Sequence, residues 1–351
     1  MKVRFITRKW PPAVGGMETY CLRMSQEIAK RCSVETIVLQ GRKGGRGPSA
    51  LAMLRFGILN AIRAPFRSYA DVVHLGDLAI WPLGFLELIF GRTRRLVISA
   101  HGSDVSLARR AGWRSGLYRI YLWVGARLLP QASVLANSTY IACLANSMGF
   151  KDVVIIPLGT DVVPSEQPAR SGLLFAGRIS RAKGLRFLIT EVLPKLPEST
   201  LLRVAGPVWE ESERDLLAHS QVEYLGVLTP DELVAQYSRA LITVIPSQIE
   251  EGFGLVAIEA AACGCQVVAS NGGGLREAVR SPWGELAEPS DASAWAAAIA
   301  RRLSLDVDER EAVGQAARQD IDWHFRWHIA ADQTMAHYQT DTRERGKGRR
   351  E

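Results

Sequence analysis

The sequence has few cysteines and no long apolar run. Its five cysteines stand in no metal-ligand spacing, and two of them, Cys263 and Cys265, fall where a helix is expected to pack against a strand. The longest uncharged apolar run, residues 78–86, is less than half of what a membrane-spanning helix needs. We therefore expect small buried thiols rather than a metal site, and no transmembrane span.

We also expect no secretory leader. Met1 is followed directly by a strand-like stretch, KVRFITRKW, with no long hydrophobic region and no small-residue cleavage site. The composition, 47% hydrophobic and 23% charged, is that of an ordinary globular protein, and 351 residues are enough for two domains. We expect a cytoplasmic protein.

Positive charge is concentrated in the first half of the chain. Residues 1–162 contain 22 Lys and Arg but nine Asp and Glu, whereas the remainder contains 21 and 27. Trp and Tyr are interleaved with these basic clusters, a mixture that suits the headgroup region of an anionic membrane. We expect peripheral association with the inner face of the plasma membrane. Nucleic acid or mere solubility would also fit the charge, but no zinc-finger spacing or RNP-like strand is present, so we expect no nucleic-acid partner.

Short strands alternate with helices twice along the chain. This alternation implies a parallel sheet flanked by helices, so the sequence predicts an α/β protein with two such sheets. The strand-like runs are residues 3–7, 34–39, 72–75, 96–100, 133–136 and 153–157, and then 172–177, 201–206, 222–225, 241–246 and 266–270.

A polar, proline-containing stretch around Pro164 separates the two series of strands. We expect a first domain of residues 1–162 and a second domain of residues 163–322. Residues 323–341 are expected to contain an amphipathic helix, and the charged residues 342–351 to form a disordered tail.

Several of the predicted strands are followed by glycine, charged or hydroxyl side chains. Ligands of open α/β sheets bind outside the carboxyl ends of the strands, so these loops are the candidate site. Arg178 and Lys183 lie on one such loop, and the glycine pairs Gly15–Gly16 and Gly252–Gly254 each precede a helix. Cations and the amides at helix starts are what a diphosphate requires.

Two glutamates belong to the last of these units. Glu251 precedes the helix, and Glu259 lies eight residues later among alanines. A buried carboxylate is costly unless something donates a hydrogen bond to it, and the vicinal hydroxyls of a ribose are suitable donors. Pairing of Glu259 with a nearby Arg, or capping of a neighbouring element, is the alternative.

The stretch EGFGLVAIEA resembles the E-x7-E motif of the retaining glycosyltransferases of family 4. PPAVGGMETY, HGSD, IPLGTD and FAGRISRAKG resemble other motifs of that family, in the same order, so that the resemblance extends from about residue 11 to about residue 288. It implies the GT-B fold, in which two Rossmann-like domains with parallel sheets face each other across a cleft and a C-terminal helix crosses back to the first domain.

The resemblance also implies roles for individual residues. His101, Glu251, Arg178 and Lys183 would be catalytic: His101 near the reacting carbon of the sugar, Glu251 on the sugar hydroxyls, and the two cations on the diphosphate. Glu259 would bind the ribose. The remaining contacts to the nucleotide sugar would come from Gly15 and Gly16 at the β-phosphate, from the amides of Gly252, Phe253, Gly254, Leu255 and Val256, and from Gly226 and Val227 beside the base.

The function so implied is retaining transfer of a sugar from a nucleoside-diphosphate sugar to a hydroxyl acceptor, such as a lipid-linked saccharide in surface polysaccharide or glycolipid biosynthesis. We expect no cofactor and no metal, because no DxD-type carboxylates follow a strand. A sugar-nucleotide epimerase or a phosphorylase with the same architecture is the alternative. A dinucleotide-dependent oxidoreductase is disfavoured because no G-x-G-x-x-G follows the first strand.

The sequence departs from the family pattern in places. Leu275 stands where the family commonly has proline, and a DG-x-x-G segment is replaced by RSPWGE at 280–285. The resemblance is weaker between Ser33 and Leu96, where acceptor contacts are expected.

Overall fold

The computed structural model forms two compact units. Unit 1 comprises Met1–Leu158 and the segment that begins at Trp327, and unit 2 comprises Gly159–Arg326. The expected tail at 342–351 lies outside the described residues, which are 1–42, 44–109, 111–165 and 170–340.

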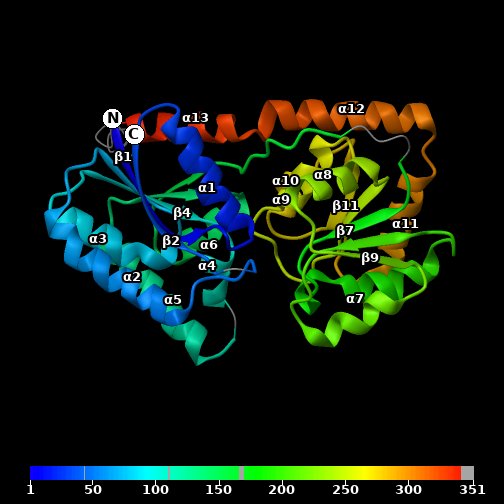
Figure 1. Cartoon of the computed structure of the whole chain (residues 1–351), viewed down its shortest axis with the longest axis horizontal. Helices are drawn as coiled ribbons and strands as arrows, with labels where there is room; N and C mark the ends of the chain where they lie inside the picture. Colours follow the sequence, from blue (N-terminus) through cyan, green and yellow to red (C-terminus); the bar gives the residue numbers. More distant parts are fainter. Residues whose placement is uncertain (43, 110, 166–169, 341–351) are drawn as a thin grey trace, which may run out of the picture. The chain divides into compact units, whose positions relative to one another are not determined.

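Unit 1 is built on a six-stranded parallel sheet with the order β2-β1-β3-β4-β5-β6 (Figure 1). All six strands were predicted from the sequence, because β-branched runs of this length are typical of strands buried on both faces. The strands are β1 (Lys2–Trp10), β2 (Ser33–Gln40), β3 (Val72–Leu75), β4 (Arg95–Ala100), β5 (Ser133–Ala136) and β6 (Asp152–Ile155).

Helices cover both faces of this sheet. Figure 1 shows α1 (Gly16–Ala29) and α13 (Trp327–Gln339) on one side, and α2 (Ala50–Arg63), α3 (Trp81–Ile89) and α5 (Trp113–Leu128) on the other. The other helical elements of unit 1 are η1 (Ala64–Phe66), η2 (Leu78–Ile80), α4 (Ser103–Ser106), η3 (Leu107–Arg109) and α6 (Thr139–Ser147).

The C-terminal helix α13 is part of the core of unit 1. It packs against α1, and the Tyr338 hydroxyl lies 2.5 Å from Nδ1 of the buried His74 on β3. The other ring nitrogen of His74 lies 2.7 Å from the Ser99 hydroxyl on β4, which in turn lies 2.7 Å from the Tyr20 hydroxyl on α1. The expected return of the last helix to the first domain is thereby confirmed.

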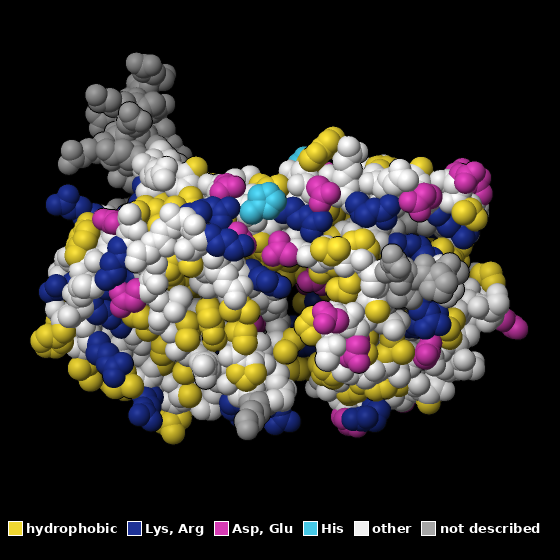
Figure 2. All heavy atoms as spheres, turned by 45° about the horizontal axis from the view of Figure 1, so that its top comes forward, with side chains coloured by type: hydrophobic (Ala, Val, Ile, Leu, Met, Phe, Trp, Pro, Cys, Tyr) yellow, Lys and Arg dark blue, Asp and Glu magenta, His cyan; other side chains and the backbone are white. Residues whose placement is uncertain are grey.

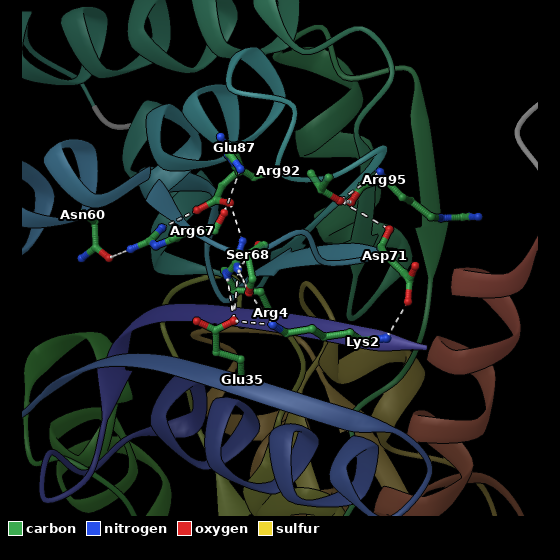
Figure 3. Close-up of polar contacts among 11 residues, drawn as sticks. Lys2, Arg4, Glu35, Asn60, Arg67, Ser68, Asp71, Glu87, Arg92 and Arg95 are labelled. Carbon is green, nitrogen blue, oxygen red and sulfur yellow. Dashed lines mark hydrogen bonds and ion pairs between the residues drawn. The ribbon is translucent and has the colours of Figure 1, made fainter. Parts of the chain in front are cut away.

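A buried ionic network ties β1 to the opposite helix layer (Figure 3). Arg4 of β1 is fully buried and donates to Glu87 of α3 at 2.7 Å and to Glu35 of β2 at 3.1 Å. Arg67 donates to the other Glu87 oxygen and to the side-chain oxygen of Asn60. Because each buried charge here has a partner of opposite sign, the network avoids the large cost of an unpaired ion.

Unit 2 contains a second six-stranded parallel sheet, with the order β12-β11-β10-β7-β8-β9. Its last strand, GELA at 284–287, was not predicted, because four residues with two apolar side chains give too short a pattern. The strands are β7 (Leu173–Ala176), β8 (Leu202–Ala205), β9 (Val222–Gly226), β10 (Ile242–Ile245), β11 (Gln266–Ser270) and β12 (Gly284–Ala287). Two parallel sheets confirm the predicted α/β class.

The sheet of unit 2 is likewise covered on both faces (Figure 1). Leu188, Trp295 and Ile299 belong to a continuous apolar core on the side of α11. The helical elements are η4 (Arg181–Lys183), α7 (Leu185–Phe187), η5 (Leu188–Val192), η6 (Leu193–Lys195), η7 (Glu211–Ala218), α8 (Pro230–Arg239), α9 (Leu255–Ala262), α10 (Leu275–Ala278), α11 (Ala292–Leu303) and α12 (Val307–His324).

Two sequence predictions differ from the structure. The amphipathic helix expected from residue 323 onward is divided: α12 ends at His324 and α13 begins at Trp327, because Phe325 is buried against Phe253 and its carbonyl accepts from the Thr160 amide at 2.7 Å. The five cysteines are free, and Cys21, Cys263 and Cys265 are buried as expected, but Cys32 is only half-buried and Cys143 is exposed on α6. None of the helices that the structure describes is both long and apolar enough to cross a bilayer.

Candidate functional site

The centre of the candidate site in unit 2 is the carboxylate of Glu251. Its Oε1 accepts from Lys183 Nζ and from the Ser247 hydroxyl, both at 2.5 Å. Burial alone would raise the pKa of Glu251, but the charge and hydrogen bond of Lys183, together with the Ser247 hydroxyl, outweigh it and lower the pKa. Glu251 is therefore an ionised acceptor at neutral pH, and Lys183 is oriented beside it.

The loop that carries Lys183 is fixed by a glycine. Gly184 follows η4 with a φ of +74°, and a Cβ at this position would lie 1.8 Å from the Pro246 carbonyl oxygen. The Gln248 amide donates to the Ala182 carbonyl at 2.9 Å, so the loop after β7 and the loop after β10 are joined backbone to backbone. This close approach brings Lys183 within reach of Glu251.

Arg178 lies on the same loop and its guanidinium faces solvent. Its Cζ lies 5.1 Å from the centre of the Trp209 ring, at cation–π distance, and its positive charge contributes to the lowered pKa of Glu251. Sequence reasoning found Arg178 but missed Trp209, which lies beyond β8 in no recognisable motif. The stacking holds the guanidinium in place without neutralising it.

Helix α9 begins at Leu255, four residues after Glu251. Its Ncap residue, Gly254, has a φ of +112° and no side chain caps the helix, so the first-turn amides of Leu255 and Val256 have no intrahelical acceptor. Positive partial charge at such a helix start favours an anion. Sequence reasoning expected this arrangement at residues 252–256.

The glycine run at residues 272–274 packs against the backbone around Glu251, and the sequence did not suggest that it belongs to the site. The Gly274 amide donates to the Glu251 carbonyl at 2.8 Å, and a Cβ on Gly273 would come within 2.3 Å of that same oxygen. Leu275, which stands in place of proline, is fully buried, and its Cδ2 would contact a Cβ on Gly254 at 2.6 Å. The departure from the family pattern therefore fills the space behind the helix start.

Glu259 lies on α9 with one polar partner, the Tyr237 hydroxyl, which donates to Oε2 at 3.2 Å. No Lys or Arg among the residues that the structure describes forms an ion pair with it, so pairing with an arginine is not its role. Burial raises the pKa of Glu259 to about 7, and the Tyr237 hydrogen bond only partly opposes this shift. Glu259 is half-buried, so its carboxylate is partly removed from water and receives few donors from the protein in return.

Gly226 is the last residue of β9 and Val227 follows it. The Gly206 amide donates to the Gly226 carbonyl at 2.7 Å, and Gly206 in turn approaches Gly177 so closely that a Cβ would lie 2.0 Å from the Gly177 oxygen. The carboxyl ends of β7, β8 and β9 thus form one continuous edge. Gly226 has a φ of +74° and open space around it, and Val227 is exposed.

His101 belongs to unit 1, at the end of β4. Asp104 accepts from the His101 and Gly102 amides at 3.0 and 2.8 Å and so fixes the turn. Burial lowers the pKa of His101, against the opposing charge of Asp104. The ring Nε2 lies 3.2 Å from the Gly76 carbonyl and must carry the proton, which leaves the buried Nδ1 as an acceptor with no partner among the described residues.

Gly15 and Gly16 mark the start of α1 in unit 1, as the sequence suggested. A Cβ on Gly15 would come within 2.6 Å of Glu18 Oε2, the end of a flexible side chain that can shift, so packing alone does not require glycine there. Glu18 pairs with Lys9 at 3.5 Å and places a carboxylate in the first turn of the helix. A phosphate at this helix start would therefore lie near a negative charge.

Known proteins match this chain along most of its length. Family models described as "Glycosyltransferase Family 4" and "Glycosyl transferases group 1" match residues 14–163 and 165–320. Glycogen synthase of Mycobacterium tuberculosis is 30% identical, with 82% of this chain and 73% of that protein covered. Alpha-maltose-1-phosphate synthase of the same organism is 27% identical, with 96% and 99% covered.

Solved structures agree on the fold. A sucrose-phosphate synthase from Thermosynechococcus elongatus superposes with a TM-score of 0.78 at 21% identity, covering 96% of this chain and 98% of the other. The Anabaena protein HepE, solved in complex with UDP and glucose, superposes with a TM-score of 0.74 at 19% identity, covering 97% and 100%. Together with the two domain matches and the relative at 30% identity, these results show that the chain belongs to the family 4 glycosyltransferases of the GT-B fold.

Proposed function

We propose that this glycosyltransferase moves a sugar from a nucleoside-diphosphate sugar to a hydroxyl acceptor with retention at the anomeric carbon. The observation that carries the proposal is the joint placement of Lys183, Glu251 and the uncapped start of α9, with the under-partnered Glu259 on the same helix. Positive groups for a diphosphate and a carboxylate for hydroxyl donors thus occur on one short segment.

The proposed roles follow from the charges. As the bond between the anomeric carbon and the leaving oxygen breaks, negative charge grows on the β-phosphate. Lys183, Arg178 and the α9 amides are already oriented, so they stabilise that charge without rearranging, which is the largest single contribution in many enzymes. In retention by same-face attack, the departing phosphate oxygen takes the proton of the acceptor hydroxyl, and no protein nucleophile is used.

Carboxylates would select the donor. Glu259 would accept hydrogen bonds from the ribose hydroxyls, which supplies the donors that Tyr237 alone does not. Glu251, held ionised by Lys183, would accept from sugar hydroxyls. Val227 and Gly226, at the open end of β9, are proposed to lie beside the base.

Unit 1 is proposed to contribute to donor binding as well. The unpartnered Nδ1 of His101 would accept from a sugar hydroxyl near the reacting carbon. Gly15 and Gly16 are proposed to approach the β-phosphate. We propose a saccharide or a lipid-linked saccharide of surface polysaccharide or glycolipid biosynthesis as acceptor, presented at the cytoplasmic face of an anionic membrane, because unit 1 carries the excess of positive charge.

A thermal-shift screen of UDP-, GDP- and ADP-sugars tests donor binding, since a ligand of the native state raises the melting temperature. We expect the nucleotide sugars of one base to raise the melting temperature of the wild type, and to raise that of the Lys183→Met variant much less. Stabilisation by none of them would refute the proposed site.

Turnover tests then separate the alternatives. Conversion of the donor without acceptor would indicate an epimerase, and sugar-phosphate formation with inorganic phosphate a phosphorylase. For a transferase, proton NMR of the product should show the donor's anomeric configuration. We expect activity to persist in EDTA, and its loss would refute metal independence.

A further inference from the structure

Helix α2 and the turn after it present a row of apolar side chains to solvent. Successive members are three or four residues apart, so they form one stripe along the exposed side of the helix rather than a core face. Exposed fractions run from 51% to 85% for Leu51, Leu54, Ile58, Ile62 and Phe66.

Helix α5 repeats this arrangement. Trp113, Leu117, Ile120 and Trp123 are again three or four residues apart, and between 47% and 72% of each side chain is exposed. Helix α3 packs against both α2 and α5, so the three helices form one layer on the same side of the unit 1 sheet (Figure 1). We call the exposed side of α2, η1 and α5 the α2–α5 surface.

The charged side chains of this surface are all positive. α2, η1 and α5 contain no Asp or Glu, whereas the exposed side chains of Arg55, Arg63, Arg114, Arg119 and Arg127 lie among the apolar ones. Arg114 and Arg127 lie over the rings of neighbouring tryptophans, at 5.4 and 4.8 Å from the ring centres. Figure 2 shows hydrophobic and Lys or Arg side chains intermingled along the lower edge of unit 1.

The most exposed member, Phe66, stands on an anchored turn. Arg67, the next residue, is bonded to Glu87 of α3 and to Asn60 of α2, and its carbonyl accepts from Arg92 at 3.0 Å (Figure 3). The base of the turn is thus fixed by the buried network while the phenyl ring projects outward. An aromatic ring held in solvent by a rigid support is characteristic of an interaction surface.

We propose that the α2–α5 surface docks on an anionic lipid bilayer, with both helices lying in the headgroup plane. Apolar stripes flanked by arginine and tryptophan fit this layer, where the rings reach the acyl boundary and the guanidinium groups meet lipid phosphates. A second copy of the chain is disfavoured, because the surface would place arginines against arginines. Nucleic acid would leave the leucine and isoleucine stripes exposed.

Vesicle flotation of the full chain tests the proposal, which deepens the membrane part of the proposed function but needs no sugar donor. The probes are phosphatidylcholine vesicles with and without phosphatidylglycerol, at low and high salt. We expect binding to the anionic vesicles only, weakened by salt. Trp113→Ser should lower the partition coefficient about tenfold, because the ring no longer leaves water. Arg119→Gln should lower it about fivefold.

Matched controls come from unit 2, where Trp323 on α12 and Arg214 are exposed. Trp323→Ser and Arg214→Gln should bind vesicles like the wild type. Equal losses in these controls, equal binding to neutral vesicles, or no flotation would overturn the proposal. A dimer dissociated by Trp113→Ser would assign the surface to a second copy, and RNA binding abolished by the same change would assign it to nucleic acid. Since flotation does not require turnover, a failure here leaves the proposed sugar transfer standing, and the converse also holds.

Discussion

Replacement of Glu259 by glutamine should make the folded protein more stable at alkaline pH but weaken its binding of the nucleotide sugar. In the unliganded protein the pKa of Glu259 is raised from 4.5 to about 7 by burial, so the folded state holds this proton more tightly than the unfolded chain. The contribution of this group to stability is therefore greatest below pH 4.5 and is lost as the pH rises through about 7. With about 1.4 kcal/mol for each tenfold change in proton affinity, the loss at pH 8 is about 3 kcal/mol.

Glu259→Gln keeps the shape and cannot ionise. We expect the variant to be more stable than the wild type by up to about 3 kcal/mol at pH 8 and almost equal to it near pH 4.5, as measured by urea unfolding. A variant that is less stable than the wild type at pH 8 would refute the inference that the ionised carboxylate is under-partnered.

Binding should change in the opposite direction. If the ribose hydroxyls donate to the ionised carboxylate, the wild type should bind its nucleotide sugar about 30-fold more weakly near pH 5.5 than near pH 8.5, because only a few per cent of Glu259 is ionised at the lower pH. Isothermal titration calorimetry measures this dependence. The intact nucleoside-diphosphate sugar is the ligand of choice, because the terminal phosphate of a free nucleoside diphosphate would titrate near pH 6 itself. A wild-type affinity that does not vary with pH, or a Gln variant with the same pH profile, would refute the assignment.

Three further predictions concern the supporting residues. Gly184→Ala should lower the free energy of unfolding in urea by at least about 2 kcal/mol, because both the φ of Gly184 and its contacts forbid a Cβ. Gly226 has the same φ but lies in open space, so Gly226→Ala should lower the free energy of unfolding by about 1 kcal/mol. Equal losses in the two variants would show that the Gly184 contact is unimportant. Lys183→Met should weaken donor binding by about tenfold or more in calorimetry, because the diphosphate would then meet the Glu251 carboxylate without the lysine counterion. An unchanged affinity would place the diphosphate elsewhere. Tyr338→Phe should lower the free energy of unfolding by about 1–2 kcal/mol, because it leaves the buried Nδ1 of His74 without its partner. An unchanged urea midpoint would show that water replaces the hydroxyl.

The fold could be predicted almost completely, because its strands are β-branched runs bounded by glycine and charge. What escaped prediction depends on tertiary contacts. The short strand at 284–287 is defined by its pairing with β11, and the break after His324 by the burial of Phe325. Neither leaves a periodic signal in the sequence.

The candidate site was predictable where motifs carry it and not where packing does. Arg178, Lys183 and Glu251 were expected on neighbouring loops, and the structure adds the bond between Lys183 and Glu251. The partners Ser247 and Tyr237 went unrecognised, because a lone hydroxyl at a strand end and a tyrosine on an amphipathic helix are common in any protein. Their roles follow only from three-dimensional proximity.

Helix α13 has a consequence for biosynthesis. The polypeptide emerges from the ribosome with its N-terminus first, yet His74 obtains its Tyr338 partner, and Arg31 its contact with Asp332, only after all of unit 2 has been translated. Until then, while roughly half of the chain is still being made, the side of α1 that packs against α13 stays uncovered in the nascent first unit. Slowed elongation within unit 2, or loss of a holdase chaperone, should aggregate this protein more than one whose domains close in sequence order.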